Sequence, residues 1–183
     1  MSTQSIADIP AVSAEDHWVE PLEDGTHVLI RPLRPEDRER EVEFIRNLSP
    51  ETRHFRFLCA IKEASPALLE RLMDVDYQRR MAFVALVHQD GKLVEVGICR
   101  YADTAEPGQC ECAVTVADGW QERGLGAVLM RHLIQAAREN GFKEMYSMDA
   151  AANAPMHALA RELGFQCNRD PQDSAQVIYS LLL

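Results

Sequence analysis

Short apolar runs, some alternating with polar residues and some continuous, occur on both sides of residues 33–80 in the first two thirds of the chain and predict β-strands. Strands are expected at 18–22, 27–32, 81–88, 93–101 and 109–117. Asp24-Gly25 separates the first two runs and is a strong hairpin-turn signal. Short turns separate the last three runs, which is typical of an antiparallel meander.

Apolar residues at helical spacing, with start and stop signals around them, predict the helices. Pro35, Ser49-Pro50 and Ser65-Pro66 each begin a short helix, and the strongest helix spans Gly126–Asn140. The remaining elements are a strand at 144–149, a helix at 153–163, and strands around 165–168 and 177–182. This order predicts an α/β fold with a mixed, mostly antiparallel central sheet and flanking helices.

The first residues differ from the rest in composition. Residues 1–26 hold six acids and no Lys or Arg, and residues 1–16 are small and polar. We therefore expect a mobile acidic tail over 1–17 and a single domain over 18–183. The formal net charge of the chain is −10, of which the first 26 residues account for six charges.

Charge and cysteine content exclude several classes of function. A net charge of −10 disfavours nucleic acid and acidic membranes as partners. The chain lacks both a membrane-length apolar run and a signal-peptide pattern, so we expect a cytoplasmic protein. The five cysteines fit a reducing compartment, and Cys110-x-Cys112 has no further Cys/His set to complete a metal site, so no metal is expected.

The segment that carries chemistry runs from Val114 to Met130. A strand passes through a glycine-rich turn directly into the strongest helix. The first turn of a helix offers unpaired amides and a positive dipole end, and glycines allow close approach, so the segment can cradle a pyrophosphate. Leu129 stands where a dinucleotide fingerprint needs its third glycine, and a P-loop would need Gly-Lys-Ser/Thr. Gln121, Gly124 and Gly126 fit the Gln-x-x-Gly-x-Gly loop that binds acyl-CoA; the alternative is a turn that only packs strand against helix.

Over residues 24–183 the sequence resembles the GNAT superfamily of acyl-CoA-dependent N-acyltransferases. The resemblance rests on Gln121–Gly126 and on the stretch from Asn153 to Gly164-Phe165, which looks like the family's closing helix. The segments at 24–26, 30–37 and 48–53 look closer to one branch, the acetyltransferase domain of bacterial Pat-type protein-lysine acetyltransferases. The resemblance implies a GNAT-like fold with acetyl-CoA as cosubstrate.

The resemblance also assigns the residues that would bind the cosubstrate. The backbone of Val114 and Val116 would pair with the pantetheine arm, and an amide near Val116 would face the thioester carbonyl. Asn153 matches a side chain that bonds the pantetheine or the leaving group, although Asn is also a good helix N-cap. The backbone expected to hold the pyrophosphate is that of Gln121, Glu122, Arg123, Gly124, Leu125, Gly126 and Ala127.

Glu111 is the candidate general base, because the Pat-type branch has a proposed catalytic Glu at this place. A lysine amine with a pKa near 10.4 must lose a proton before it attacks, and a nearby carboxylate can take it. The alternative is a Glu that only faces solvent on an alternating strand. Ala160 departs from the family, since many members carry a general-acid Tyr there.

The function expected from these features is direct transfer of an acetyl group to a primary amine, with a protein lysine as acceptor. Two alternatives stay open: a small-molecule amine as acceptor, and a non-catalytic module that binds or senses acyl-CoA. The chain would work as a monomer or homodimer. Arg53, Arg56, Arg79 and Arg80 either face solvent or bind an anionic cofactor tail or an acidic substrate.

Overall fold

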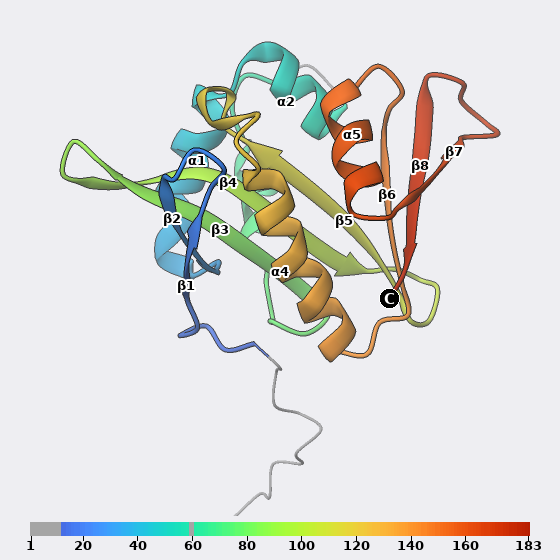
Figure 1. The fold of residues 1–183 in the computed structure, drawn as a ribbon, viewed down its shortest axis with the longest axis horizontal. Coiled ribbons are helices and arrows are strands. Elements are labelled where there is room, and N and C mark those ends of the chain that lie inside the picture. The colour runs from blue at the N-terminus through green and yellow to red at the C-terminus, as the bar shows by residue number, and fades with distance from the viewer. Residues whose placement is uncertain (1–11, 59–60) are drawn as a thin grey trace, which may run out of the picture.

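A computed structural model describes residues 12–58 and 61–183, and its centre is one eight-stranded sheet (Figure 1). The strand order is β1-β2-β3-β4-β5-β6-β8-β7. Every neighbouring pair is antiparallel except β5 and β6, which are parallel. The strands are β1 (Trp18–Pro21), β2 (His27–Pro32), β3 (Arg80–Gln89), β4 (Lys92–Asp103), β5 (Gln109–Val116), β6 (Glu144–Ala150), β7 (Gln166–Arg169) and β8 (Gln176–Leu182). The predicted mixed, mostly antiparallel α/β fold is confirmed.

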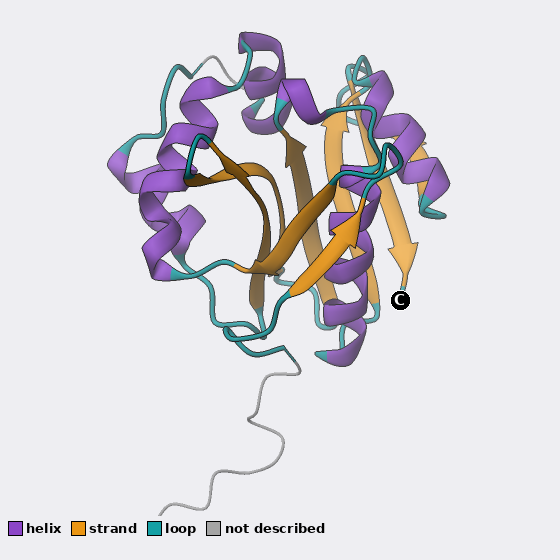
Figure 2. Ribbon diagram, turned by 60° about the vertical axis from the view of Figure 1, so that its left-hand side comes forward, coloured by secondary structure: helices purple, strands orange, loops and turns teal. Residues whose placement is uncertain are grey.

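Helices cover both faces of the sheet (Figure 2). On one face lie α1 (Arg38–Asn47), α2 (Pro50–Phe57) and α3 (Pro66–Met73). On the other lie α4 (Leu125–Glu139) and α5 (Ala154–Glu162). A short 3₁₀ turn over Pro35–Asp37 comes before α1, so the first turn of that predicted helix is tighter than an α-helix.

The starts of α2 and α3 follow the sequence signals. The Ser49 side chain accepts a hydrogen bond from the Thr52 amide, and Ser65 does the same for Leu68. Each helix then has Pro in its first turn, where the missing amide costs nothing. These caps fix where α2 begins, which matters because α2 lies beside the functional site.

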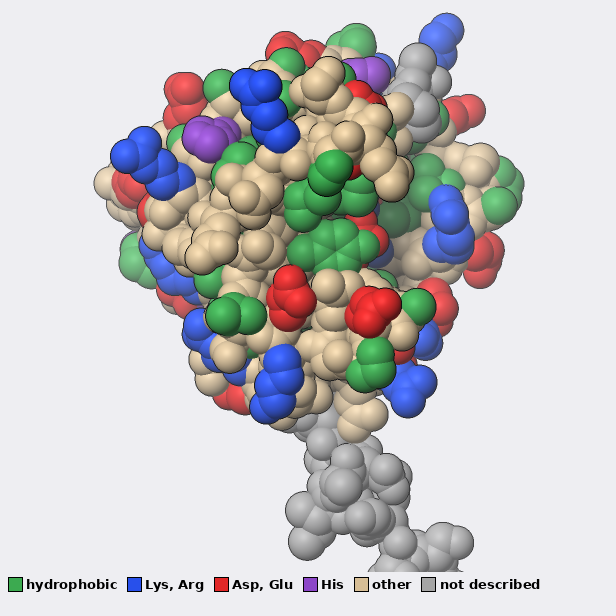
Figure 3. All heavy atoms as spheres, turned by 90° about the vertical axis from the view of Figure 1, so that its right-hand side faces the viewer, with side chains coloured by type: hydrophobic (Ala, Val, Ile, Leu, Met, Phe, Trp, Pro, Cys, Tyr) green, Lys and Arg blue, Asp and Glu red, His purple; other side chains and the backbone are tan. Residues whose placement is uncertain are grey.

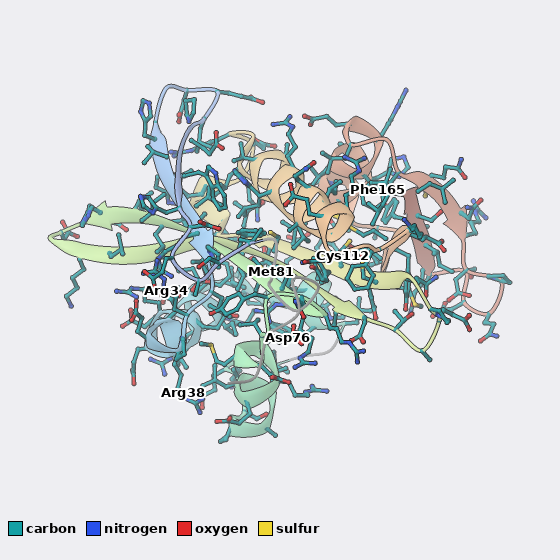
Figure 4. All side chains as sticks on the ribbon, turned by 90° about the horizontal axis from the view of Figure 1, so that it is seen from below. Arg34, Arg38, Asp76, Met81, Cys112 and Phe165 are labelled. Atoms are coloured by element: carbon teal, nitrogen blue, oxygen red, sulfur yellow. The ribbon has the colours of Figure 1, made fainter. Side chains whose placement is uncertain are left out.

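The face that α4 covers holds the larger core. Leu129 and Leu133 of α4 are fully buried against the sheet, where Met81 and Cys112 belong to the same cluster (Figure 4). Burial raises the pKa of the Cys99 thiol to about 12, so this cysteine is a small core residue and not a nucleophile. Cys59 lies outside the described residues.

The start of the chain meets the domain earlier than the sequence predicts. Val12 is 7% exposed and packs into the larger core, and the Arg34 side chain donates a hydrogen bond to the Ala14 carbonyl. The packed part therefore begins before residue 18. The rest of the predicted tail, residues 1–11, lies outside the described residues. Within the part of the chain that the structure describes, no helix is both long and apolar enough to cross a membrane.

Candidate active site

The site begins where β5 and β6 separate. The two strands pair only through Gln109–Glu111 and Glu144–Tyr146, and β5 then continues to Val116 (Figure 1). The Ala117 amide donates to the Val96 carbonyl on β4. Because amides point to alternate sides along a strand, the amides of Val114 and Val116 face away from β4, into the space beside β5. An extended ligand can therefore add to this edge as a strand would.

A cavity of about 1400 Å³ opens at this separation and extends to the start of α4. It brings together ten of the eleven site residues predicted from the sequence, which come from β5, the turn after it, α4 and the N-cap of α5. The ten are Glu111, Val114, Val116, Gln121, Glu122, Gly124, Leu125, Gly126, Ala127 and Asn153. Residues far apart in the sequence thus line one space.

The glycine loop, residues 121–127, has the backbone shape of an anion site. Glu122 and Gly124 both have positive φ, of 61° and 83°, and α4 starts at Leu125. The Val128 amide donates to the Gly124 carbonyl, whereas the amides of Leu125, Gly126 and Ala127 lie in the open first turn. These amides and the positive end of the α4 dipole suit a pyrophosphate.

Each glycine of the loop also has a packing reason. A Cβ on Gly124 would lie 3.0 Å from Glu23 Oε1, and one on Gly126 would lie 3.2 Å from Leu159 of α5. Gly126 therefore lets α5 pack closely beside the loop. The packing role of these glycines is compatible with the ligand interpretation of the motif, which stays a prediction.

Arg123 is the predicted site residue that does not line the cavity. Its guanidinium lies 3.4 Å from Asp24 and 4.7 Å from the centroid of the Trp120 ring. The side chain is thus engaged with the β1–β2 turn and with an aromatic face. Only its backbone remains a candidate for the pyrophosphate.

Glu111 stands at the point where the two strands part. Its side chain is exposed and faces the cavity, and the Tyr146 hydroxyl donates a hydrogen bond of 3.4 Å to Glu111 Oε2. Burial, followed by the negative charge of Glu111, raises the pKa of Tyr146. The carboxylate is therefore reachable from the cavity and is held from one side.

Asn153 makes the cap that its residue type favours. Its Oδ1 accepts from the Met156 amide at 3.3 Å, and its Nδ2 lies 3.3 Å from both carboxylate oxygens of Asp149. Burial raises the pKa of Asp149, which also lines the cavity. Ala160, at the position where many GNAT proteins have Tyr, is 2% exposed and packs with Val177 and Tyr179.

Asp118 is a site residue that the sequence analysis missed. Its carboxylate accepts from the Ser49 amide at 2.8 Å, the Ser49 hydroxyl at 2.7 Å and the Thr52 hydroxyl at 2.8 Å. It therefore fastens the start of α2 to the turn that follows β5. Only a capping sequence at Ser49 hinted at this contact, since its partner is 69 residues away.

Known proteins identify the fold and the chemistry. A sequence model of the Acetyltransferase (GNAT) family matches residues 43–165. The chain belongs to this family. An acetyltransferase of Pseudomonas aeruginosa is 69% identical over 168 residues, which are 92% of this chain and 90% of that protein. The acetyltransferase Pat of Mycolicibacterium smegmatis is 30% identical over 141 residues, 76% of this chain and 41% of that protein.

A solved structure of a Pat GNAT domain is also similar to this GNAT protein. The GNAT domain of S. lividans Pat superimposes with a TM-score of 0.82 at 25% identity, covering 91% of this chain and 97% of that domain. The predicted resemblance is confirmed, and the protein is a GNAT N-acetyltransferase. The family uses acetyl-CoA and an acceptor amine, and the open amides, the free β5 edge and the shared cavity fit that pair of substrates.

Proposed function

We propose that this GNAT protein transfers the acetyl group of acetyl-CoA directly to the amine of a protein lysine, with Glu111 as general base. One observation carries the proposal: Glu111 lies at the parting of β5 and β6, in the cavity that the glycine loop also lines. A base at that point can reach an amine that attacks a thioester held along β5.

Different residues of the cavity would bind different parts of acetyl-CoA. The amides of residues 121–127 would hold the pyrophosphate, and the amides of Val114 and Val116 would pair with the pantetheine arm. The cap at Asn153 places its amide group in the same cavity. Acetyl-CoA supplies an activated acetyl thioester; the protein supplies position, a proton acceptor and hydrogen-bond donors.

The proton is the main barrier that Glu111 would lower. A lysine amine has a pKa near 10.4, so freeing its lone pair at pH 7 costs about 4–5 kcal/mol. Glu111 takes that proton directly or through water, while the Val116 amide donates to the carbonyl oxygen on which negative charge develops. With Ala160 in place of Tyr, the CoA thiolate leaves without a protein acid from α5. A thiolate is a fairly stable leaving group, since a free Cys thiol has a pKa of about 8.5.

Charge and resemblance support a protein lysine as the acceptor. The chain has 29 acids against 19 Lys and Arg, so a cationic lysine meets a net attractive field. On the face shown in Figure 3, charges of both signs surround a hydrophobic centre, which suits a protein surface better than a polyanion. The Pat-type resemblance supports the same acceptor. We further propose a cytoplasmic protein that binds no nucleic acid, membrane or metal and works as a monomer or homodimer.

The test compares Glu111→Gln with Glu106→Gln, a control on the exposed turn before β5. Initial rates are measured with lysine peptides, and acetyl-CoA affinity by calorimetry. We expect Glu111→Gln to lower kcat by about 10²–10⁴-fold, while its acetyl-CoA affinity and the rates of the control stay at wild-type values. An unchanged kcat would remove Glu111 from the mechanism. Transfer to small amines with none to peptides would replace the lysine acceptor by a small molecule.

A further inference from the structure

Helix α2 brings Arg56 into the cavity on the side of Glu111. Arg56 lies in the last turn of α2 and lines the cavity together with Glu111 and Asp149. In Figure 1, α2 lies across the end of the sheet toward which β5 and β6 part, and it contacts both strands. This places a cation at the reacting end of the cavity.

The cavity's other half-buried arginines have partners. Arg80 lies 3.2 Å from Asp74, and Arg100 donates to the Leu72 carbonyl at 2.7 Å and to Glu41 at 3.4 Å. These bonds hold α3 and α1 against the sheet. Arg80 and Arg100 therefore already have structural tasks.

The Arg56 side chain makes no hydrogen bond or ion pair with residues 12–58 and 61–183. Its guanidinium lies 4.9 Å from the centroid of the Phe57 ring. Burial, and after it the charge of Arg100, lowers the pKa of Arg56 to about 10. The side chain still carries its charge at neutral pH, so it is a half-buried cation that suits an anion.

Acetyl-CoA would not supply that anion. Its pyrophosphate would lie at the glycine loop with the 3′-phosphate beyond it, and its pantetheine arm is neutral. Arg56 interacts electrostatically with the buried Glu41 and then with Glu111 and Asp149, of which the last two line the cavity at the end where the acceptor enters. The acceptor is the substrate that can bring a negative group to this place.

We propose that Arg56 binds a carboxylate on the acceptor, close to the amine that Glu111 deprotonates. The inference rests on the proposed function and adds the class of acceptor: a molecule that carries a carboxylate beside its amine. The carboxylate can belong to an acidic residue next to a lysine in a protein, or to a free amino acid. In both sources a planar guanidinium recognises it through paired hydrogen bonds.

The experiment uses two pairs of acceptors that differ only in one carboxylate. The first pair is the capped peptides Ala-Glu-Lys-Ala and Ala-Gln-Lys-Ala; the second is Nα-acetyl-lysine and its amide. Transfer to the ε-amine is measured for wild type, Arg56→Gln and Arg71→Gln. Arg71 is a matched control because it lines the same cavity but is exposed to solvent.

We expect the wild type to prefer the carboxylate member by about tenfold or more in kcat/KM, as for a hydrogen bond to a charged group. Arg56→Gln should lower the rate on the carboxylate member far more than the rate on the neutral member and so lose this preference, and Arg71→Gln should keep the preference. A preference within only one pair identifies the source of the carboxylate. Thermal melting and acetyl-CoA affinity should be the same in all three proteins.

Two results would overturn the proposal. The first is a wild type that shows no preference within either pair. The second is an Arg56→Gln variant that slows both members of a pair equally or shifts both pH profiles, because Arg56 would then act as a counter-charge for Glu111. If the wild type binds acetyl-CoA and acetylates none of the four acceptors, the proposed lysine function fails, and this inference fails with it.

Discussion

Glu95 is buried beside another acid, and replacing it should change how the stability of the protein depends on pH. Glu95 of β4 is 4% exposed and Glu41 of α1 is 2% exposed. In the described part of the chain, no donor reaches either oxygen of Glu95 or Glu41 Oε2, whereas Arg100 lies 3.4 Å from Glu41 Oε1. A proton on Glu95 would supply the missing donor. Burial, followed by the charge of Glu41, raises the pKa of Glu95.

The sign of the effect follows from this shift. An unfolded Glu has a pKa of about 4.3, and the folded state holds the proton to a higher pH than the unfolded state. The contribution of Glu95 to stability is complete below the unfolded pKa of about 4.3 and is lost as the pH rises from there through the folded pKa. The loss is at most about 1.4 kcal/mol per pH unit.

The perturbation is Glu95→Gln, which keeps the shape and a hydrogen-bond donor but cannot ionise. Urea unfolding, followed by tryptophan fluorescence, gives the free energy of unfolding at pH 5, 6, 7 and 8. We expect the variant to gain stability over the wild type as the pH rises. Glu43→Gln, on the exposed side of α1, should show a constant difference. A constant difference for Glu95→Gln as well would refute the reasoning.

Three further predictions concern the cofactor half of the site. Burial would raise the pKa of Asp118, but hydrogen bonds from Ser49 and Thr52 hold it below its usual value. Asp118→Ala should therefore lower the free energy of unfolding by about 1 kcal/mol at pH 7. Urea melts should show this cost shrinking as the pH falls through the folded pKa. Glu23 lies against Gly124, so Glu23→Gln should tighten acetyl-CoA binding by about two- to fivefold at low salt, and titration calorimetry in 0.5 M salt should find the gain reduced. Asn153→Ala should lower the free energy of unfolding by about 1 kcal/mol and Asn153→Ser by much less, because Ser also caps a helix. If both variants lose the same acetyl-CoA affinity, the Asn153 side chain binds acetyl-CoA in addition to capping α5.

Local signals predicted the elements well. Ser49 and Ser65 mark helix starts through a cap that forms within three residues, and Gly124 allows the positive φ that ends the turn before α4. Such interactions form between residues that are close in the sequence, so a single sequence is enough to predict them. The strands predicted at 81–88 and 93–101 lie at Arg80–Gln89 and Lys92–Asp103 in the structure, and they were found for the same reason, since a short turn joins them.

Contacts between segments far apart in the chain could not be predicted from the sequence. The pairing of β5 with β6 stops at Glu111 and Tyr146, and no residue pattern marks that point. Alternation along β5 therefore left open whether Glu111 faces a cavity or bulk solvent. In the same way, the sequence does not show that β5 and β6 lie beside the last turn of α2. A charged residue in that turn could equally face solvent, so the role of Arg56 stayed open.

The two halves of the site are joined by side chains, and this explains why the motif alone predicted only one of them. Gln121 begins the glycine loop, and its Nε2 lies 3.2 Å from the Val116 carbonyl and 3.4 Å from the Thr52 hydroxyl. Thr52 in turn donates to Asp118. The loop that suits the pyrophosphate and the helix that carries Arg56 are therefore parts of one hydrogen-bonded unit. A loop motif is local and readable, but the position of the acceptor helix depends on bonds that span 69 residues.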